Sequence, residues 1–410
     1  MANGKKAAVK KKKGKKGGIK GFFRKCWRLI NLGYAFVTNT EEKEIRKKPK
    51  LFGRTVTFAG FMIMMVVFIV LISVILNNRS VGVDKAKIIV TGLPSDFEGY
   101  RLLVISDLNG RTFGDGQSTL MRKLESEKYD CVLFLGDMVG PSGDTEPFYN
   151  LIRQLNPRKN KKMYFIAGDS DPSPLLEKPR DISEEELSLR EMVLADWVLG
   201  AEELGATYVT SPVQLVRGDS VMWLMPDTFL DLETAAALDI YKEELAQQSD
   251  SYNAGVKLRR DTLPLTTFRF NQLSKTYDLI RQVTDNDLIV MLSHEVPSDS
   301  QLTVAQRVMT ESEKKNYFPF PDLVLSGHYC GGEWKLPLIG TLYVSSNILP
   351  RYGWFPDESY VQGQRTVGSI QVYTTVGLGS NAATVFSGRL NNPPRVSLLT
   401  LSGELPEEEY

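Results

Sequence analysis

Three apolar runs between residues 101 and 171 each end at an aspartate, and this pattern constrains the fold more than any other feature of the chain. The runs are residues 102–106, 131–136 and 163–168, and the acids that follow them are Asp107, Asp137 and Asp169. Short apolar runs separated by helical patterns are typical of buried parallel strands joined by crossover helices. Because ligand-binding groups collect at the carboxyl ends of such strands, the three acids predict a cation site.

Two further apolar runs end in a histidine instead of an acid. Residues 288–293 precede His294, and residues 323–327 precede His328; these are the only two histidines among 410 residues. Taken alone, a strand-end aspartate is more often a turn residue, and a buried histidine is more often a hydrogen-bonded core group. Five such residues at five strand ends favour a metal site, since carboxylates and imidazoles are both common metal ligands.

Helical and strand-like patterns around these runs predict an α/β domain that continues to the C-terminus. Helices are expected over residues 148–155, 183–204, 230–247 and 266–283. Strands are expected over residues 87–91, 208–216, 221–225 and 395–402. We predict one domain over residues 100–410, entered through a linker and lead-in strand at residues 77–99.

Residues 56–76 form a run of 21 residues without a charged side chain. As a helix this run would be roughly 30 Å long, which is the thickness of the hydrocarbon layer of a membrane. It is too long, and lies too far from the first residue, to be an ordinary signal peptide. We therefore predict one uncleaved transmembrane helix, a signal anchor, before the domain.

Residues 1–55 carry 18 lysines and arginines against three glutamates, a net charge of +15, so the rest of the chain carries −14. Positively charged flanks of a membrane span stay in the cytoplasm. We therefore expect a single-pass protein of the cell membrane, with its N-terminus in the cytoplasm and its large C-terminal domain outside.

The first 20 residues are mostly Lys, Gly and Ala, a composition that cannot build a core and predicts disorder. Such a run also suits nucleic acid. The neighbouring anchor instead favours anionic lipid of the bilayer, with a partner protein as second choice and no nucleic acid expected. Residues 21–37 mix aromatic and basic side chains, which fits either a segment lying along the inner leaflet or a solvated linker.

The chain has three cysteines, Cys26, Cys131 and Cys330. Three do not make a disulfide framework, and Cys131 lies within a predicted core strand.

Five short motifs carry the acids and histidines, and they occur in an order known from one enzyme family. They are Asp107-Leu108-Asn109, Gly136-Asp137, Gly168-Asp169-Ser170-Asp171, Ser293-His294 and Gly327-His328-Tyr329-Cys330-Gly331-Gly332. With them the chain resembles the calcineurin-like metallophosphoesterases, and within these the bacterial membrane-anchored branch. The resemblance runs from about residue 100 to the C-terminus. It implies a four-layer αββα sandwich, with two mixed sheets face to face and helices outside, that hydrolyses a phosphate ester with a metal-bound hydroxide.

The resemblance also implies a ligand set for two divalent metal ions. Asp137 would bridge both ions, the second ion would also be held by Asp169, His294 and His328, and the first by Asp107, Asn109 and Cys330. Asp169 stands where the family has Asn, whose oxygen it can replace. Asn109 and Cys330 stand where the family has His, so only the ligands of the second ion keep the types found in the family.

Asp137, Ser170 and Asp171 are the residues that the resemblance places in the catalytic set. Ser170 replaces the histidine that assists the leaving group in this family, and serine cannot supply a proton at neutral pH. Loss of a positioned general acid typically costs about 10² to 10⁴ in rate.

Cys330 bears on the identity and number of the metal ions. A thiolate is a soft ligand that favours zinc or iron over manganese. Together with three aspartates it would neutralise two divalent ions completely, so that a phosphate would gain less from entering the site. One ion or two, and manganese, zinc or iron, therefore all remain open.

Two functions of different classes fit these observations. The first is a membrane-anchored metallophosphoesterase that works outside the cell on a phosphodiester or pyrophosphate-linked envelope component. The second is a catalytically impaired or inactive relative, whose metal is structural and whose domain binds a partner at the membrane. The family pattern favours the first, whereas Ser170 and the charge of the site favour the second.

Overall fold

The structure is a computed structural model that describes residues 58–179, 190–230, 232–253, 263–306, 310–336, 339–344, 353–380 and 388–403. The chain divides into two compact units, Met1–Ser73 and Val74–Tyr410, and every strand in the described residues lies in the second. The basic tail, with Cys26 and residues 21–37, lies outside the described residues.

Two six-stranded sheets form the second unit. Sheet 1 has the order β1 (Gly82–Ile89), β17 (Arg395–Ser402), β2 (Arg101–Ile105), β3 (Cys131–Leu135), β4 (Lys162–Ile166) and β7 (Thr207–Tyr208). Sheet 2 has the order β15 (Gly363–Val367), β16 (Ile370–Thr374), β11 (Leu323–Ser326), β10 (Leu288–Leu292), β9 (Ser220–Pro226) and β8 (Val213–Arg217). In sheet 1 only β17 and β2 pair antiparallel. In sheet 2 the edge strands β15 and β8 pair antiparallel with their neighbours, and the strands between run parallel. Both sheets are therefore mixed, as expected.

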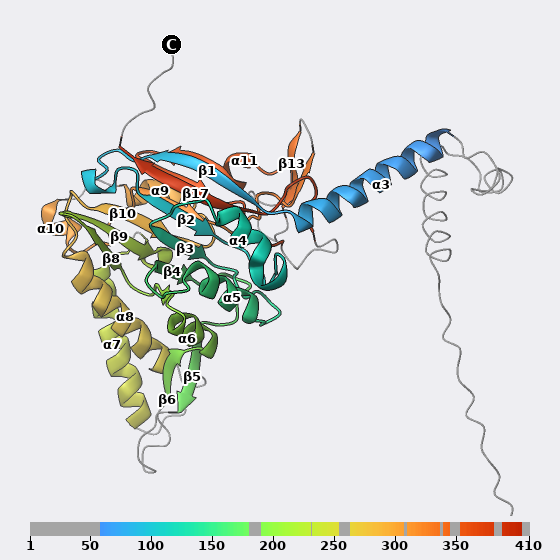
Figure 1. Cartoon of the computed structure of the whole chain (residues 1–410). Helices are drawn as coiled ribbons and strands as arrows, with labels where there is room; N and C mark the ends of the chain where they lie inside the picture. The colour runs from blue at the N-terminus through green and yellow to red at the C-terminus, as the bar shows by residue number, and fades with distance from the viewer. Residues whose placement is uncertain are drawn as a thin grey trace, which may run out of the picture. The chain divides into compact units, whose positions relative to one another are not determined.

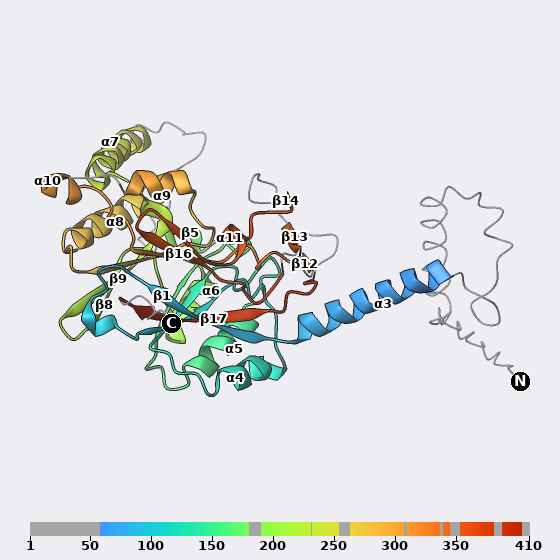
Figure 2. The same cartoon turned by 90° about the horizontal axis from the view of Figure 1, so that it is seen from above.

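Helices cover the outer face of each sheet, which gives four layers. The helices are α4 (Ser118–Leu124), α5 (Glu146–Leu155), α6 (Asp196–Glu203), α7 (Thr234–Asn253), α8 (Leu263–Ile280) and α9 (Asp299–Ala305). Figure 2 shows α4 and α5 on one side of the strands and α7, α8 and α9 on the other. Figure 1 shows α7 and α8 side by side. The expected αββα sandwich is confirmed.

Three hydrophobic cores fill the spaces between the four layers. Successive residues of a strand face opposite sides of the sheet. Thus Phe134 of β3 packs with Phe148 of α5, while Leu133 of the same strand joins the core between the two sheets. Met291 of β10 packs with Leu273 of α8 in the third core. The residues of β3 and β10 are buried along their whole length, which explains why both strands are continuous apolar runs.

Smaller elements complete the unit. They are the hairpin β5 (Leu175–Pro179) and β6 (Arg190–Leu194), the sheet β12 (Trp334–Leu336), β13 (Gly340–Val344) and β14 (Gly353–Trp354), the short helices α10 (Glu311–Lys314) and α11 (Glu358–Val361), and the 3-10 turns η1 (Ser95–Phe97), η2 (Asp115–Gln117) and η4 (Asp227–Phe229).

The helix predicted over residues 183–204 is confirmed only in its C-terminal part. Within it, Arg190–Leu194 is strand β6, which pairs antiparallel with β5, and only Asp196–Glu203 is helical. Residues 180–189 lie outside the described part. The acidic and apolar residues here have helical spacing, but pairing with β5 satisfies the backbone of β6 as a strand. No local periodicity reports such a partner.

The strand predicted over residues 208–216 is two strands in different sheets. β7 lies at the edge of sheet 1 and β8 at the edge of sheet 2, and the chain passes from one to the other through Ser211 and Pro212. The lead-in strand also differs, because β1 begins at Gly82 and pairs with β17 along its whole length. The compact unit therefore includes residues 77–99, which were predicted as a linker and lead-in.

The helices predicted over residues 148–155, 230–247 and 266–283 correspond to α5, α7 and α8. α7 begins at Thr234 and extends to Asn253, whereas α8 begins at Leu263 and ends at Ile280. The strands predicted over 221–225 and 395–402 correspond to β9 and β17.

Helix α3 (Phe58–Arg79) has 22 residues and overlaps the predicted transmembrane run at residues 56–76. The first two residues of that run lie outside the described part of the chain. Counting described residues only, we find no helix both long and apolar enough to cross a membrane. The predicted transmembrane helix is therefore not confirmed.

Candidate active site

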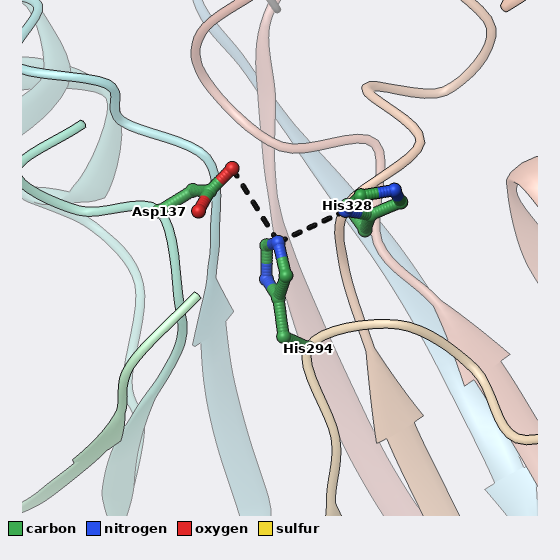
Figure 3. Close-up of side chains that lie close together, drawn as sticks. All are labelled: Asp137, His294 and His328. Atoms are coloured by element: carbon green, nitrogen blue, oxygen red, sulfur yellow. Dashed lines mark hydrogen bonds and ion pairs between the residues drawn. The ribbon is translucent and has the colours of Figure 1, made fainter. Parts of the chain in front are cut away.

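The loops after β3, β10 and β11 bring Asp137, His294 and His328 together at one edge of the two sheets (Figure 3). His294 Nε2 lies 3.0 Å from His328 Nδ1 and 3.4 Å from a carboxylate oxygen of Asp137. Asp137 follows a strand of sheet 1, whereas both histidines follow strands of sheet 2. The site therefore forms only where the two sheets meet.

A backbone carbonyl holds the ring of His294 in place. His294 Nδ1 lies 2.8 Å from the carbonyl oxygen of Leu135, the last residue of β3. Because a carbonyl can only accept, Nδ1 carries a proton, and in a neutral ring Nε2 then holds the lone pair. A metal ligand histidine is commonly oriented in this way by its second nitrogen. His294 thus presents its metal-binding nitrogen to Asp137 and His328.

The charges of Asp137 and His294 stabilise each other. Burial on its own lowers the pKa of His294, but the hydrogen bond and charge of Asp137 outweigh it and raise this pKa to about 10. Burial likewise opposes the charged form of Asp137, yet His294 and the Ser170 amide hold the pKa of Asp137 below its ordinary value. A cation that binds between them must displace the proton on Nε2.

Two groups of potential ligand atoms share His328. Asp137, His294 and His328 form the first group, and Asp169, Glu295 and His328 form the second; within each, the ligand atoms all lie within 4.8 Å of one another. Asp169 approaches His328 Nδ1 to 3.6 Å, and its side chain is 70% exposed. Of the four ligands predicted for the second ion, Asp137, His294 and His328 form one group, and Asp169 joins it only through His328. Glu295 was missed, although its position directly after His294 was a signal that could have suggested it.

The residues predicted to hold the first ion are placed differently. Asp107 is fully buried, and one of its oxygens accepts from the Ser106 hydroxyl and from the His328 amide, the latter at 3.1 Å. The other oxygen of Asp107 and the side-chain oxygen of Asn109 are buried without a hydrogen-bond partner. Among the described residues, no group of three His, Cys, Asp or Glu ligand atoms includes Asp107 or Cys330.

Burial also governs the protonation of these two residues. It raises the pKa of Asp107 above its ordinary value. It raises the pKa of the Cys330 thiol well above its ordinary value, and the charge of Asp107 adds to this effect. Burial thus favours the neutral thiol of Cys330 in the metal-free protein.

Five predicted ligands have a backbone conformation that side chains rarely adopt. The φ angles are 53° at Asp107, 50° at Asn109, 54° at Asp137, 71° at His328 and 51° at Cys330. Glycine is favoured in this left-handed region, so a larger residue there carries a cost that the surroundings must offset. Strain of this kind clusters at functional sites. The turns after β2, β3 and β11 thus carry side chains where glycine would be less strained.

Two glycines allow the loops to approach so closely. A Cβ atom on Gly168 would lie 2.2 Å from an Asp137 carboxylate oxygen, and one on Gly136 would lie 2.6 Å from His294 Nδ1. These contacts give a physical reason for a glycine before both Asp137 and Asp169.

Ser170 and Asp171 position the loops around Asp137. The Ser170 amide donates to an Asp137 oxygen at 2.8 Å. One Asp171 oxygen accepts from the amides of Val139 and Gly140 at 2.7 and 3.0 Å, and the other accepts from Gly168 at 2.9 Å. The Asp171 carboxylate is thus used to join the loops after β3 and β4. The catalytic role predicted for Asp171 stays a prediction.

The arrangement defines a class of site, a cluster of carboxylates and imidazoles able to hold a divalent cation at the joint edge of two mixed sheets. The sequence matches the model of the calcineurin-like phosphoesterase family over residues 100–331, which is more than half of the chain and contains every predicted site residue. The chain belongs to the calcineurin-like phosphoesterase family. Members bind divalent metals, and the donor atoms gathered here fit that requirement.

One curated relative is Phosphodiesterase YaeI of Escherichia coli (strain K12), which is 35% identical over 80 residues. The match covers 20% of this chain and 25% of the relative, so the chain matches about a quarter of the relative's length.

Two solved structures are similar at low identity. Phosphopantetheinyl hydrolase PptH from Mycobacterium tuberculosis has a TM-score of 0.31 at 11% identity, with 69% of this chain and 91% of that chain covered. Sulfate thiohydrolase SoxB from Thermus thermophilus, in complex with glycerol, has a TM-score of 0.30 at 11% identity, with 75% and 57% covered.

Proposed function

We propose that the protein is a metal-dependent hydrolase of phosphate esters, acting on a phosphodiester or a pyrophosphate-type linkage. The observation that carries the proposal is the meeting of Asp137, His294 and His328 at the edge of the two sheets, in a chain of this family. The name of the relative, a phosphodiesterase, supports the same class of substrate.

The ion would be held by Asp137, Asp169, His294 and His328, with Glu295 as a further donor beside His328. Imidazole and carboxylate ligands suit manganese, zinc and iron. A bound divalent ion would supply Lewis-acid polarisation of a phosphoryl oxygen and make a coordinated water more acidic. The carbonyl of Leu135 fixes His294, and the Ser170 amide fixes Asp137, so both ligands are oriented before the ion arrives.

Ser170 bears on which esters the protein can cleave. Its amide is engaged with Asp137, and its hydroxyl is a poor acid at neutral pH. Substrates whose leaving group needs little protonation are therefore favoured. A pyrophosphate linkage, which releases a phosphate anion, and an aryl ester both meet this requirement.

We also propose that the protein acts at a membrane, with the domain on the outer side. The uncharged run at residues 56–76 and the net charge of +15 before it support this location. Anionic lipid is the proposed partner of the basic tail.

A second candidate is a binding module that keeps a metal without turnover. Three observations favour it: Asn109 and Cys330 stand where the family has histidines, and Ser170 stands where the family has its leaving-group acid. The module would bind an envelope partner through the same edge of the sheets.

Turnover of an aryl phosphodiester separates the two candidates. The full chain is purified in detergent, stripped with a chelator, reloaded with manganese, zinc or iron, and assayed with bis(4-nitrophenyl) phosphate. Because the aryl leaving group needs little protonation, Ser170 should not conceal activity. We expect turnover with at least one metal, and none after Asp137→Ala. A chain that binds metal but turns over nothing would favour the binding module.

The location is tested separately by protease treatment of intact cells. We expect the large domain to be digested while the basic tail is protected. Survival of the domain would overturn the proposed orientation.

A further inference from the structure

Arg389 is a fully buried arginine next to the half of the site that holds Asp107. Its guanidinium donates to the backbone carbonyls of Gly379, Val376 and Gly377, the last two at 2.9 and 3.0 Å. Arginine is almost never fully buried unless it is paired. A guanidinium buried in this position must therefore be stabilised by the groups around it.

The loop that Arg389 holds packs directly on Asp107. The Leu378 amide donates to the carbonyl of Ser106 at 3.0 Å, and the Gly379 amide donates to the carbonyl of Asp107. A Cβ atom on Gly377 would lie 2.6 Å from an Asp107 carboxylate oxygen. Arg389 thus supports the loop that closes one side of the Asp107 carboxylate.

Charges of both signs surround Arg389. Burial lowers the pKa of Arg389, and Cys330, Asp107 and Glu333 lie close enough to oppose this shift in part. Glu333 is only 2% exposed, and the amide of Leu390 donates to its carbonyl at 3.0 Å. Burying a charge is costly unless an opposite charge lies near, and Arg389 lies near the carboxylates of Asp107 and Glu333.

Arg111 adds a second guanidinium to the same group. It follows Asn109 by two residues, and burial and the nearby charge of Arg389 both lower the pKa of its guanidinium. We call Asp107, Arg111, Cys330, Glu333 and Arg389 the arginine cluster. Its two carboxylates and two guanidiniums balance one another without any metal ion.

The other half of the site has the opposite composition. Asp137, His294 and His328 form one group of close ligand atoms there, and Asp169 and Glu295 form a second group with the same His328. The arginine cluster offers the carboxylates of Asp107 and Glu333 and the sulfur of Cys330, but among the described residues none of these belongs to a group of three close ligand atoms. An added divalent ion there would also meet two guanidiniums. The arginine cluster therefore does not fit the first metal of the family.

We propose that this protein holds one metal ion, at Asp137, His294 and His328, and that Arg389 supplies in the Asp107 half the positive charge that a metal supplies elsewhere in the family. The guanidinium is fixed by three carbonyls and cannot dissociate, so this half carries its charge permanently. Arg389 is then a positioning residue that holds Asp107 and the 376–379 loop. The inference rests on the metal site of the proposed function, but not on turnover.

Metal stoichiometry of the full chain tests the inference without a substrate. The protein in detergent is dialysed against excess manganese or zinc, freed of unbound ion, and measured by elemental analysis. We expect one ion per chain, loss of that ion in His294→Ala, and retention of it in Cys330→Ala. Two ions per chain, no ion, or equal loss in the Cys330 variant would overturn the inference.

Cobalt loading gives a second readout at Cys330. If the sulfur ligated a metal, the cobalt protein would show sulfur-to-cobalt charge-transfer absorption that disappears in Cys330→Ala. We expect no such absorption. Its presence in the wild-type protein would contradict the inference.

A matched pair of variants tests Arg389 itself. Asn109→His with Cys330→His restores the family ligands, and we expect this double variant still to bind one ion because Arg389 remains. Adding Arg389→Met should allow a second ion to bind. A folded triple variant that still binds one ion would refute the role of Arg389, as would a double variant that binds two. If the triple variant does not fold, the number of ions bound by the wild type and by the double variant, together with the cobalt spectrum, still tests the inference.

These measurements separate this inference from the proposed function. One ion per chain without turnover would support the arginine cluster and sink the hydrolase. Turnover with two ions per chain would support the hydrolase and overturn the inference of a single ion.

Discussion

His294 Nε2 lies 3.4 Å from a carboxylate oxygen of Asp137, and this contact joins the loop after β10 of sheet 2 to the loop after β3 of sheet 1. The contact also explains why neither sheet alone provides a site. Sheet 1 positions Asp137 and sheet 2 positions His294, and the core between the sheets holds the two sheets together.

Asp137→Asn should weaken metal binding more than it weakens the fold. The amide keeps the shape of the side chain but loses the charge that faces His294. Removing groups that merely support a ligand typically costs about 10- to 100-fold in metal affinity, so removing a charged ligand should cost at least that much. Calorimetric titration with manganese or zinc measures the change. An affinity equal to that of the wild type would exclude Asp137 as a ligand.

Gly168→Ala should disturb the site through a single methyl group. The new Cβ would lie 2.2 Å from an Asp137 oxygen, so the carboxylate must move away from His294. We expect metal affinity to fall by about tenfold or more. Gly82→Ala is the control, because its Cβ would meet Arg395 at an ordinary 3.5 Å. Equal effects of the two variants on metal binding would refute the explanation.

Asp171→Asn should reveal whether this residue positions loops or transfers protons. Its carboxylate accepts three backbone amides, and an Asn amide nitrogen cannot accept the same bonds. We expect a loss of about 1 to 3 kcal/mol in the free energy of unfolding, measured by urea denaturation. The pH profile of the residual phosphodiester activity should keep its shape. Loss of one limb of that profile would instead assign Asp171 a proton-transfer role.

Ser170→His should restore a leaving-group acid selectively. The gain should be large for an alkyl phosphodiester, up to about 10² to 10⁴ in rate, and small for an aryl phosphodiester. Comparing kcat/KM for the two esters in the wild type and the variant measures this. An equal gain on both esters, or none on the alkyl ester, would contradict the role assigned to this position.

Asp322→Asn should alter the pH dependence of stability away from the site. Burial raises the pKa of Asp322 from 3.8 to about 6, against the opposing hydrogen bond from the Ile289 amide. The folded protein therefore binds the proton more tightly than the unfolded chain does. The resulting stabilisation is complete below pH 3.8 and is lost as the pH rises through 6.

Asn cannot ionise, but its oxygen can still accept from Ile289. Relative to the wild type, the variant should therefore gain about 2 kcal/mol in the free energy of unfolding between pH 4 and pH 7. Denaturation at several pH values measures the difference between the two proteins. A constant difference would contradict the raised pKa.

The strand ends that carry the site could be predicted because each strand and its ligand are adjacent in the sequence. Runs such as residues 131–136 are apolar on both faces, since β3 is buried on both, and the turn after each run carries its ligand. The spacing of the motifs then indicated which residues belong together. Asp137, His294 and His328 could be grouped in this way before their contacts were known.

Long-range pairing could not be read in the same way. Strand β1 joins β17 from the opposite end of the domain, and β6 is a strand because β5 lies beside it. Arg389 lies far from Asp107 in the sequence, and only the folded loop at residues 376–379 connects them. No motif marks such an arginine, so the charge balance of the Asp107 half was invisible in the sequence.

Titrating the metal-free chain with manganese, zinc or iron while following aryl phosphodiester turnover tests the central claim most directly. For the metal that supports turnover, we predict a rate that rises to one equivalent of metal per chain and then stays constant, with no turnover in His294→Ala. A chain that holds its ion but has no turnover at any ratio, or a His294→Ala variant as active as the wild type, would contradict the account.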